Sequence, residues 1–231
     1  HEEGGSFLGS GRGKQDVGQL VDRLVADGIS VFFIVGGDGT LRGGEAIADE
    51  IHRRGLSIAV VGVPKTIDND IAFMDRTFGF ETAVEVARGA LRAAHTEATG
   101  ARNGIGLVKL MGRDAGFIAA HATLASSDVN FCLVPEVPFR LGGEDGLCAA
   151  LERRLASRGH ALIAVAEGCG VHLAGEGAER DASGNLRYAS AGLDIGVHVR
   201  DGILSYFRQR EVPITLKYID QDDELNAGEE H

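Results

Sequence analysis

The sequence has few cysteines, and their pattern excludes a cysteine-based metal module. Its 231 residues include three cysteines, Cys132, Cys148 and Cys169, which form neither a CxxC pair nor another metal-ligand spacing. Because their number is odd and Cys132 and Cys169 lie in apolar, strand-like runs, we expect thiols that pack as small hydrophobic side chains. Such thiols are typical of a reducing, intracellular compartment, so the sequence predicts a cytoplasmic protein.

The sequence also has fewer basic than acidic residues, and it has no long apolar run. Lys and Arg together number 23 against 34 Asp and Glu, which gives a formal net charge of −11 at pH 7. Nucleic acids and anionic membranes favour a basic surface, so this balance argues against generic binding to either. No apolar run approaches the roughly 18 residues of a membrane-spanning helix, and the start has no signal-peptide pattern. No membrane or nucleic-acid partner is therefore expected.

What the sequence does contain is an alternation of apolar, β-rich runs with amphipathic helical segments. Its length and 44% hydrophobic content are enough for one large α/β domain or parts of two. The apolar run SVFFIV at 30–35 predicts a strand buried on both faces. Further strands are expected at 57–63, 104–110, 130–135, 160–168 and 213–219, and helices at 16–28, 44–55, 78–98, 114–126, 143–158 and 197–210. This order predicts the α/β class, in three layers, with helices on both faces of a parallel sheet.

Ligands of such sheets bind beyond the carboxyl ends of the strands, so the loops that follow the strands are informative. The first of these loops is GGDGT, where Gly36, Gly37 and Gly39 would let the backbone approach an anion and tolerate a positive φ. Asp38 would repel a phosphate unless a cation lies between them, so Mg²⁺ is expected there. The alternative is a glycine-rich turn in which Asp38 only caps the next helix.

The second loop, PKTIDND, follows the next strand and carries two carboxylates. Asp68 and Asp70 are separated by one residue and can have different chemical roles. One can take a proton from an attacking hydroxyl, and the other can help to hold a metal. Lys65 and the hydroxyl of Thr66 would lie beside the phosphate that is transferred. The alternative is an Asx turn whose side chains bond their own backbone.

Three more polar residues follow strands or precede the first one. Arg113 could stabilise charge on a phosphoryl group, or be a surface arginine. Glu167 could accept a hydrogen bond from a sugar hydroxyl, or be the partner of an arginine. Arg12 lies in a glycine-rich segment that suits a nucleotide phosphate or a flexible start. Together these loops predict phosphoryl transfer from a nucleotide or polyphosphate to a hydroxyl.

In order and spacing, GGDGT, PKTIDND, MGRDAGF, PEVPF and AEG resemble the phosphofructokinase family over residues 5–220. GGDGT alone is shared with lipid kinases and NAD kinases, whereas TIDND followed by MGR is specific. The resemblance implies a phosphofructokinase-like fold. It also implies Mg²⁺-dependent transfer of phosphate to the 1-hydroxyl of fructose 6-phosphate, in glycolysis.

The resemblance implies a role for each of these residues. Asp68 would be the general base, with Thr66 and Ile67 completing its loop, and Arg113 would also stabilise the transition state. The sugar phosphate would contact Met111, Gly112 and Arg113, a sugar hydroxyl would contact Glu167, the metal would contact Asp38 and Asp70, and the donor would contact Arg12, Gly13, Gly36, Gly37, Asp38, Gly39, Thr40 and Lys65.

The identity of the donor depends on two positions. Pyrophosphate-dependent members carry a second Asp after the metal-binding Asp, and its side chain and charge occupy the space of an ATP α-phosphate. That position here is Gly39, which favours ATP, whereas Lys65 is typical of the pyrophosphate enzymes. The mixed signature is similar to a branch that resembles the pyrophosphate enzymes yet uses ATP. We expect ATP, and pyrophosphate is the alternative.

The resemblance also implies a division of the chain. Residues 1–100 would bind the donor, 101–220 would form an incomplete fructose 6-phosphate part, and 221–231 are expected to be a disordered tail. The family's first phosphate loop would precede residue 1, and family members continue beyond KYID, so a chain truncated at both ends is expected. A non-catalytic ligand-binding fragment or subunit is therefore the second hypothesis. Because family subunits contribute arginines to each other's sites, a homo-oligomer, either a dimer or a tetramer, is expected.

Overall fold

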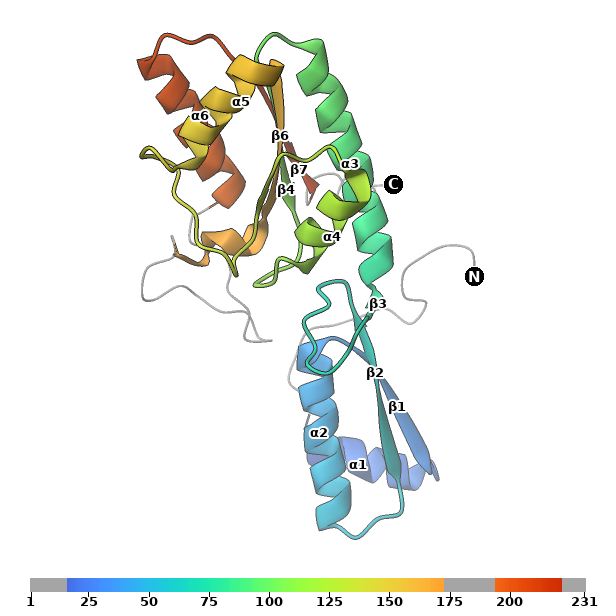
Figure 1. Ribbon diagram of the computed structural model, residues 1–231. Coiled ribbons are helices and arrows are strands. Elements are labelled where there is room, and N and C mark those ends of the chain that lie inside the picture. Colours follow the sequence, from blue (N-terminus) through green and yellow to red (C-terminus); the bar gives the residue numbers. More distant parts are fainter. Residues whose placement is uncertain (1–15, 173–193, 222–231) are drawn as a thin grey trace, which may run out of the picture. The chain divides into compact units, whose positions relative to one another are not determined.

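The computed structural model describes residues 16–172 and 194–221, which belong to two compact units (Figure 1). The first unit comprises 16–64, and the second comprises 65–172 and 194–221. Within these ranges, no helix is long and apolar enough to cross a membrane. The predicted donor contacts of Arg12 and Gly13 and the predicted tail beyond Gln221 lie outside the described residues. The functional division at residue 100 stays a prediction.

The first unit consists of two parallel strands and two helices. α2 packs on β1 and against α1, and the buried residues of the unit come from these three elements. β1 and β2 pair in parallel from Val31 with Ala59 to Gly36 with Pro64. The elements are α1 (Val17–Ala26), β1 (Val31–Gly36), α2 (Asp38–Arg53) and β2 (Ala59–Thr66).

One face of β1 is exposed, so the prediction of a strand buried on both faces was wrong. Ile34 is buried among the helices, whereas Phe33 is 62% exposed and its same-face neighbours Val31 and Val35 are exposed as well. Side chains alternate between the faces of a strand. An apolar run that fills both faces cannot reveal which of them is covered, and that information lies in the helices around the sheet.

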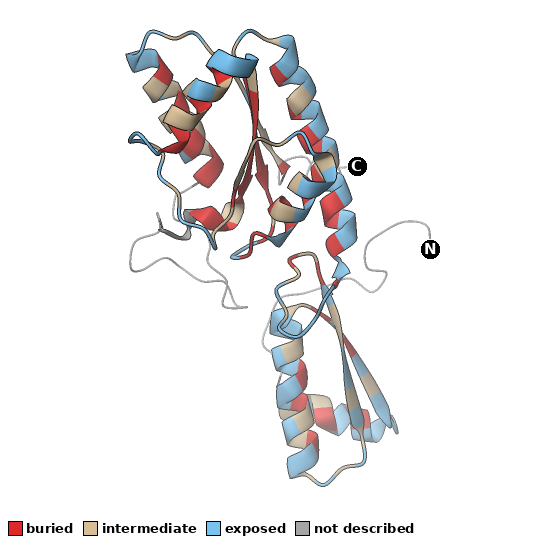
Figure 2. Cartoon of the chain, in the orientation of Figure 1, coloured by how far each residue is buried: buried red, intermediate tan, exposed pale blue. Residues whose placement is uncertain are grey.

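The second unit is a three-layer α/β domain, which confirms the predicted fold class. Its parallel sheet has the order β5–β6–β4–β7, with α3 and α4 on one face and α5 and α6 on the other (Figure 1). The central strands β4 and β6 are buried almost throughout (Figure 2), as expected where helices cover both faces. The elements are β3 (Phe78–Gly79), α3 (Phe80–Gly100), β4 (Gly104–Leu110), α4 (Phe117–Ser126), β5 (Phe131–Leu133), α5 (Leu147–Arg158), β6 (His160–Ala166), η1 (Glu167–His172), α6 (Ile195–Gln209) and β7 (Thr215–Asp220).

The register of this sheet brings three strand ends together. Leu110 of β4 is paired with Ala166 of β6, and Lys109 of β4 is paired with Asp220 of β7. The residues that follow these strands therefore leave the sheet at one edge. In the same unit, the last two residues of β2 pair with β3. The loops predicted to carry chemistry after β2, β4 and β6 belong to this unit.

β4 begins at a glycine because the end of α3 lies directly against it. A Cβ on Gly104 would lie 2.8 Å from the carbonyl carbon and 2.9 Å from the Cα of Ala98, and backbone atoms cannot rotate away. We expect Gly104→Ala to lower the free energy of unfolding by about 1–3 kcal/mol, the range for an overpacked site. Urea unfolding measures this change.

A second glycine provides the control for this substitution. Gly89 lies within α3, and nothing lies within 4 Å of a Cβ added there. Gly89→Ala should raise the free energy of unfolding by about 0.5–1 kcal/mol, because alanine is the better helix former. Equal stability of the Gly104→Ala and Gly89→Ala proteins would contradict the close packing of β4 on α3.

Candidate active site

Asp68 lies in the loop that follows β2, and its carboxylate is buried. The Oγ1 of Thr66 donates a hydrogen bond to Oδ2 of Asp68 at 3.1 Å, and it accepts one from the backbone N–H of Asp68 at 3.2 Å. Thr66 is the last residue of β2 and is buried as well. These local bonds hold the Asp68 carboxylate in one orientation.

Arg113 approaches the same carboxylate from the loop after β4. Its Nε lies 3.3 Å from Oδ2 of Asp68. The Arg113 side chain stays 45% exposed, so the rest of its guanidinium can meet a ligand. The structure therefore brings together Asp68, Thr66 and Arg113, three of the residues that the sequence predicted as one site.

The surroundings of Asp68 change its acidity. Burial raises the pKa of this carboxyl above its ordinary value, and the nearby charge of Asp70 adds to the rise. The positive charge of Arg113 and the hydrogen bond from Thr66 lower the pKa, but they do not cancel the effect of burial. A carboxylate with a raised pKa is a better proton acceptor than an exposed one, which suits a general base.

Two residues that the sequence interpretation did not single out hold the Asp68 loop in place. Asn69 has a φ of 56°, and its Oδ1 accepts a hydrogen bond from the backbone N–H of Thr77 at 2.9 Å. The Thr77 hydroxyl donates to the carbonyl oxygen of Thr66 at 2.7 Å. The bond between Asn69 and Thr77 spans eight residues, so it is not the Asx turn considered for this loop. The residue type of Asn69 tolerates its left-handed backbone. Lys65 and Asp70, which belong to the same segment of the chain as Asp68, are exposed.

Side chains that follow other strands accept hydrogen bonds from the backbone N–H groups of the loop after β4. Oε1 of Glu167 accepts hydrogen bonds from the N–H of Gly112 at 3.1 Å and of Arg113 at 2.5 Å. Glu167 directly follows β6. The sequence analysis considered Glu167 as the partner of an arginine, and the structure gives it the main chain of Arg113. Its contact with a sugar hydroxyl stays a prediction.

Sequence reasoning missed two further acceptors for this loop. Oε1 of Gln221 accepts from the N–H of Met111 at 3.3 Å, and Oε1 of Glu136 accepts from the N–H of Gly116 at 2.8 Å. Gln221 is buried, although it is the first residue of the segment predicted to be a disordered tail. No pattern around Gln221 indicated this contact, whereas Glu136 belongs to the PEVPF motif that carries the family resemblance.

The GGDGT loop lies in the first unit and opens α2. Gly37 is the N-cap of this helix, and Asp38, its first residue, forms an ion pair with Arg42 one turn later, so the alternative of Asp38 as the helix cap is not observed. Gly36 lacks a side chain because a Cβ there would overlap the side chain of Thr40. Within the described residues, none of the three glycines of this loop has a positive φ, so their tolerance of one is not used, and the close approach of an anion stays a prediction.

The described residues contain no cluster of three or more His, Cys, Asp or Glu side chains that could hold a metal ion by themselves. Mg²⁺ that is bound with phosphates usually takes only one or two carboxylates from the protein. Asp38 and Asp70 are exposed and offer hard oxygen ligands of this kind. The donor atoms therefore fit the predicted ion in chemistry.

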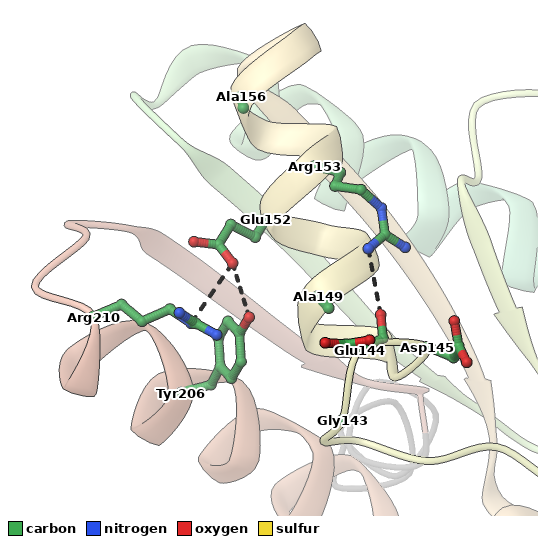
Figure 3. A pocket seen from close by; sticks show the side chains of 9 residues that line it. All are labelled: Gly143, Glu144, Asp145, Ala149, Glu152, Arg153, Ala156, Tyr206 and Arg210. Carbon is green, nitrogen blue, oxygen red and sulfur yellow. Dashed lines mark hydrogen bonds and ion pairs between the residues drawn. The ribbon is translucent and has the colours of Figure 1, made fainter.

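A groove of about 800 Å³ lies between α5 and α6 (Figure 3). Its side chains satisfy one another: the hydroxyl of Tyr206 donates to Glu152 at 2.8 Å, and Arg210 lies over the Tyr206 ring and 3.6 Å from Glu152. Arg153 donates to the carbonyl oxygen of Glu144 at 3.4 Å. None of the predicted site residues lines this groove, so it is separate from the candidate active site.

Comparison with protein families gives a match that agrees with these residues. The family model described as Phosphofructokinase matches residues 1–214. This chain belongs to the phosphofructokinase family. The resemblance of its motifs to that family is therefore confirmed.

Curated relatives of this phosphofructokinase chain are about twice as long. It is 49% identical over 223 residues to ATP-dependent 6-phosphofructokinase 7 of Arabidopsis thaliana, covering 95% of this chain and 45% of the relative. It is 50% identical over 224 residues to ATP-dependent 6-phosphofructokinase of Borreliella burgdorferi, covering 94% and 49%. The chain thus spans about half the length of the curated relatives it matches.

Solved structures bear out the phosphofructokinase fold. A pyrophosphate-dependent phosphofructokinase from Marinobacter aquaeolei matches with a TM-score of 0.66 and 24% identity, over 93% of this chain and 50% of that one. Pichia pastoris phosphofructokinase in the T-state matches with a TM-score of 0.61 and 22% identity, over 93% and 22%. At these identities the likeness concerns the fold alone.

Proposed function

We propose that this protein transfers the γ-phosphoryl group of ATP to the 1-hydroxyl of D-fructose 6-phosphate in glycolysis, giving fructose 1,6-bisphosphate and ADP. The observation that carries the proposal is the buried Asp68 carboxylate, with its raised pKa, held by Thr66 and 3.3 Å from Arg113. Membership of the phosphofructokinase family and the names of the curated relatives support the same reaction.

In this reaction Asp68 takes the proton of the sugar hydroxyl as the oxygen attacks the γ-phosphorus. The new bond joins that oxygen to phosphorus, and the bond from phosphorus to the β,γ-bridging oxygen breaks, so that ADP leaves with the electron pair. The guanidinium of Arg113 stabilises negative charge on the phosphoryl group during transfer. Asp38 and Asp70 would hold Mg²⁺, which supplies positive charge beside the donor phosphates.

The remaining roles rest on the family resemblance and on placement. Thr66 and Ile67 would shape the loop around Asp68, and Lys65 would lie at the donor end of the same loop. Met111 and Gly112 would contact the sugar phosphate and Glu167 a sugar hydroxyl, while the donor would lie against Arg12, Gly13, Gly36, Gly37, Asp38, Gly39 and Thr40.

A coupled assay for fructose 1,6-bisphosphate, with ATP and with pyrophosphate in parallel, tests the proposal. Turnover with ATP alone is expected, and turnover with pyrophosphate alone would establish the alternative donor. Binding of fructose 6-phosphate in calorimetry without turnover on either donor would support the second hypothesis, a non-catalytic member of the family. No binding and no turnover would overturn the proposal for this chain.

The donor preference has a sharper test at Gly39, which is exposed in the first turn of α2. An acidic side chain is tolerated at a helix N-terminus, so Gly39→Asp should fold normally. We expect this substitution to lower kcat/KM for ATP by about tenfold or more, because it places a negative charge where the α-phosphate would lie. Steady-state kinetics with varied ATP measures the effect.

Gly43→Asp is the matched control, because Gly43 lies one turn further along the same helix and a Cβ there has open space. It adds the same charge to α2 and should leave kcat/KM for ATP within about twofold of the parent. Equal losses in the two variants would mean that net charge, and not the position of Asp, governs the use of ATP.

We also propose a homo-oligomer, a dimer or a tetramer, on the strength of the family resemblance. Light scattering of the purified protein tests it. A cytoplasmic location is proposed from the three cysteines, which are free thiols. Two of the curated relatives are named chloroplastic, so imaging of the protein in its own cells decides between the compartments.

A further inference from the structure

The turn between β4 and α4 has an unusual backbone at the residue that carries the guanidinium. Gly112 has a φ of 138° and Arg113 a φ of 51°. The left-handed region is unfavourable for a residue with a Cβ, so a non-glycine residue stays in it only where its surroundings hold it there. Arg113 is exposed, and packing of its own side chain cannot supply that hold.

Two consecutive residues that follow β6 keep Arg113 in this conformation. Glu167 accepts the N–H groups of both Gly112 and Arg113 on a single oxygen, Oε1. Its neighbour Gly168 packs against the other side of the same turn: a Cβ there would lie 3.1 Å from the Cα of Asp114 and 3.2 Å from the carbonyl carbon of Arg113. Glu167 bonds the turn, and Gly168, which has no side chain, lets the backbone of the turn pack closely against it.

The consequence of this arrangement lies at Arg113. The backbone of Arg113 sets the point and direction at which its side chain leaves the turn, and its Nε meets Oδ2 of Asp68 at 3.3 Å. Glu167 therefore connects β6 to the reacting carboxylate through the main chain of Arg113. No other acceptor of the Gly112 and Arg113 N–H groups is recorded within the described residues.

We propose that Glu167 is a positioning residue: with Gly168 it holds the left-handed turn at Gly112 and Arg113, and thereby aims the Arg113 guanidinium at Asp68 and the transferred phosphoryl group. This rests on the proposed function for its kinetic consequence, but not for its structural one. This role is additional to the contact with a sugar hydroxyl proposed above. It can be told apart from that contact because it acts through Arg113 and disappears once Arg113 is removed.

A double-mutant cycle separates the two roles of Glu167. Glu167→Ala should lower kcat for fructose 1,6-bisphosphate formation by about 10- to 100-fold, the range for losing hydrogen bonds to a charged group. In the Arg113→Ala background, the same substitution should lower the rate by a factor that is smaller by about fivefold or more, because interacting residues are not additive. The factor that remains measures the contact of Glu167 with the sugar. An equal factor in both backgrounds would overturn the positioning role and leave Glu167 with the sugar contact alone.

Two variants sharpen the cycle. Glu167→Gln keeps an Oε1 acceptor for the two N–H groups and should restore most of the lost rate. Gly168→Ala adds a methyl group against the turn and leaves Glu167 unchanged. It should lower kcat when Arg113 is present but not in the Arg113→Ala background. Glu152→Ala, in the groove between α5 and α6, makes the same chemical change at a distant carboxylate and should leave the rate as in the parent. A Gly168→Ala rate equal to the parent's would remove Gly168 from the proposal.

Amide hydrogen exchange tests the positioning role without any turnover. In Glu167→Ala, exchange at the Gly112 and Arg113 N–H groups should accelerate by about tenfold or more, while the amides of β4 and β6 keep their parental rates. Glu167→Gln and Glu152→Ala should exchange as the parent does. Unchanged exchange at both amides, or a rise spread over the whole sheet, would overturn the proposal. If the parent has no kinase activity in either assay, the proposed function fails while this measurement still decides the role of Glu167.

Discussion

Asp68→Asn is expected to lower kcat by about 10²- to 10⁴-fold, the usual contribution of a general base. Asparagine keeps the shape of the side chain and an oxygen that can accept the hydrogen bond from Thr66, but it cannot take the proton of the sugar hydroxyl. The loss should therefore appear in turnover, whereas binding of fructose 6-phosphate in calorimetry should persist. The coupled assay measures the first quantity.

An exposed carboxylate in the same loop gives the control for this substitution. Asp75 lies seven positions further along and is exposed. Asp75→Asn makes the same chemical change and should leave kcat within about twofold of the parent, since an exposed charge contributes little. A kcat for Asp68→Asn that also stays within twofold would remove Asp68 from the role of base, and with it the chemistry proposed for this site.

The raised pKa of Asp68 also fixes the direction of two pH effects. A base must be deprotonated, so the acid limb of kcat/KM should lie at a higher pH than for an ordinary carboxylate, and Arg113→Gln should move it higher still by removing the charge that lowers this pKa. A group with a raised folded-state pKa contributes stability that is present below its unfolded pKa of about 3.9 and lost as the pH rises through its folded pKa. Asp68→Asn should thus gain stability over the parent as the pH rises above about 4 in urea unfolding.

Much of the fold follows from local pattern in the sequence. The run GIGLVKL predicted β4 with its observed bounds, because six apolar or small residues and one lysine, Lys109, between helical segments are typical of a buried strand. SVFFIV has the same character but belongs to a strand with one exposed face. The difference between the two strands lies in which helices reach them, and that is a property of the assembled unit.

The candidate site was predictable to the extent that its chemistry resides in residue types. Asp68 and Arg113 stand shortly after strands, in the loops where ligands of parallel sheets bind, and the structure pairs them. Glu167 was also identified, but its observed partners are two main-chain N–H groups. The residue type alone does not indicate a contact with the main chain. Gln221 was missed for the same reason. Contacts with the backbone depend on register between strands, and register appears only in three dimensions.

Lys109→Met is expected to lower the free energy of unfolding by about 3–5 kcal/mol, the range for breaking a buried ion pair. The Lys109 side chain is 11% exposed, and its Nζ lies 2.9 Å from Oδ2 of Asp194 and 2.6 Å from Oδ2 of Asp220. The hydroxyl oxygen of Tyr218 lies 3.3 Å from an oxygen of each carboxylate, so its single proton can be donated to either of them. Methionine would fill the volume of the lysine but remove the ammonium group that bonds both carboxylates. Chemical denaturation measures the loss.

A second substitution distinguishes uncompensated charge from lost packing. Asp220→Leu removes one carboxylate, so the Lys109→Met/Asp220→Leu protein should recover at least half of the lost stability, as apolar replacements of buried ion pairs often do. Arg53→Met breaks an exposed ion pair with Glu50 on α2 and serves as the control, with an expected change below about 1 kcal/mol. A loss of this small size in Lys109→Met would mean that water still reaches the two carboxylates.

The same cluster gives the protein a defined response to acid. Burial acts to raise the pKa of Asp194, but the hydrogen bonds from Lys109 and from the backbone N–H of Val197 outweigh it, and the pKa lies below the ordinary value. A depressed folded-state pKa contributes stability above the unfolded pKa of about 3.9, and this contribution is lost as the pH falls through the folded pKa. In Lys109→Met the carboxylates lack their cation and are relieved by protonation. The stability difference between the parent and Lys109→Met should therefore be full at pH 7 and shrink below about pH 4, and a difference independent of pH would show that the ammonium group is not its source.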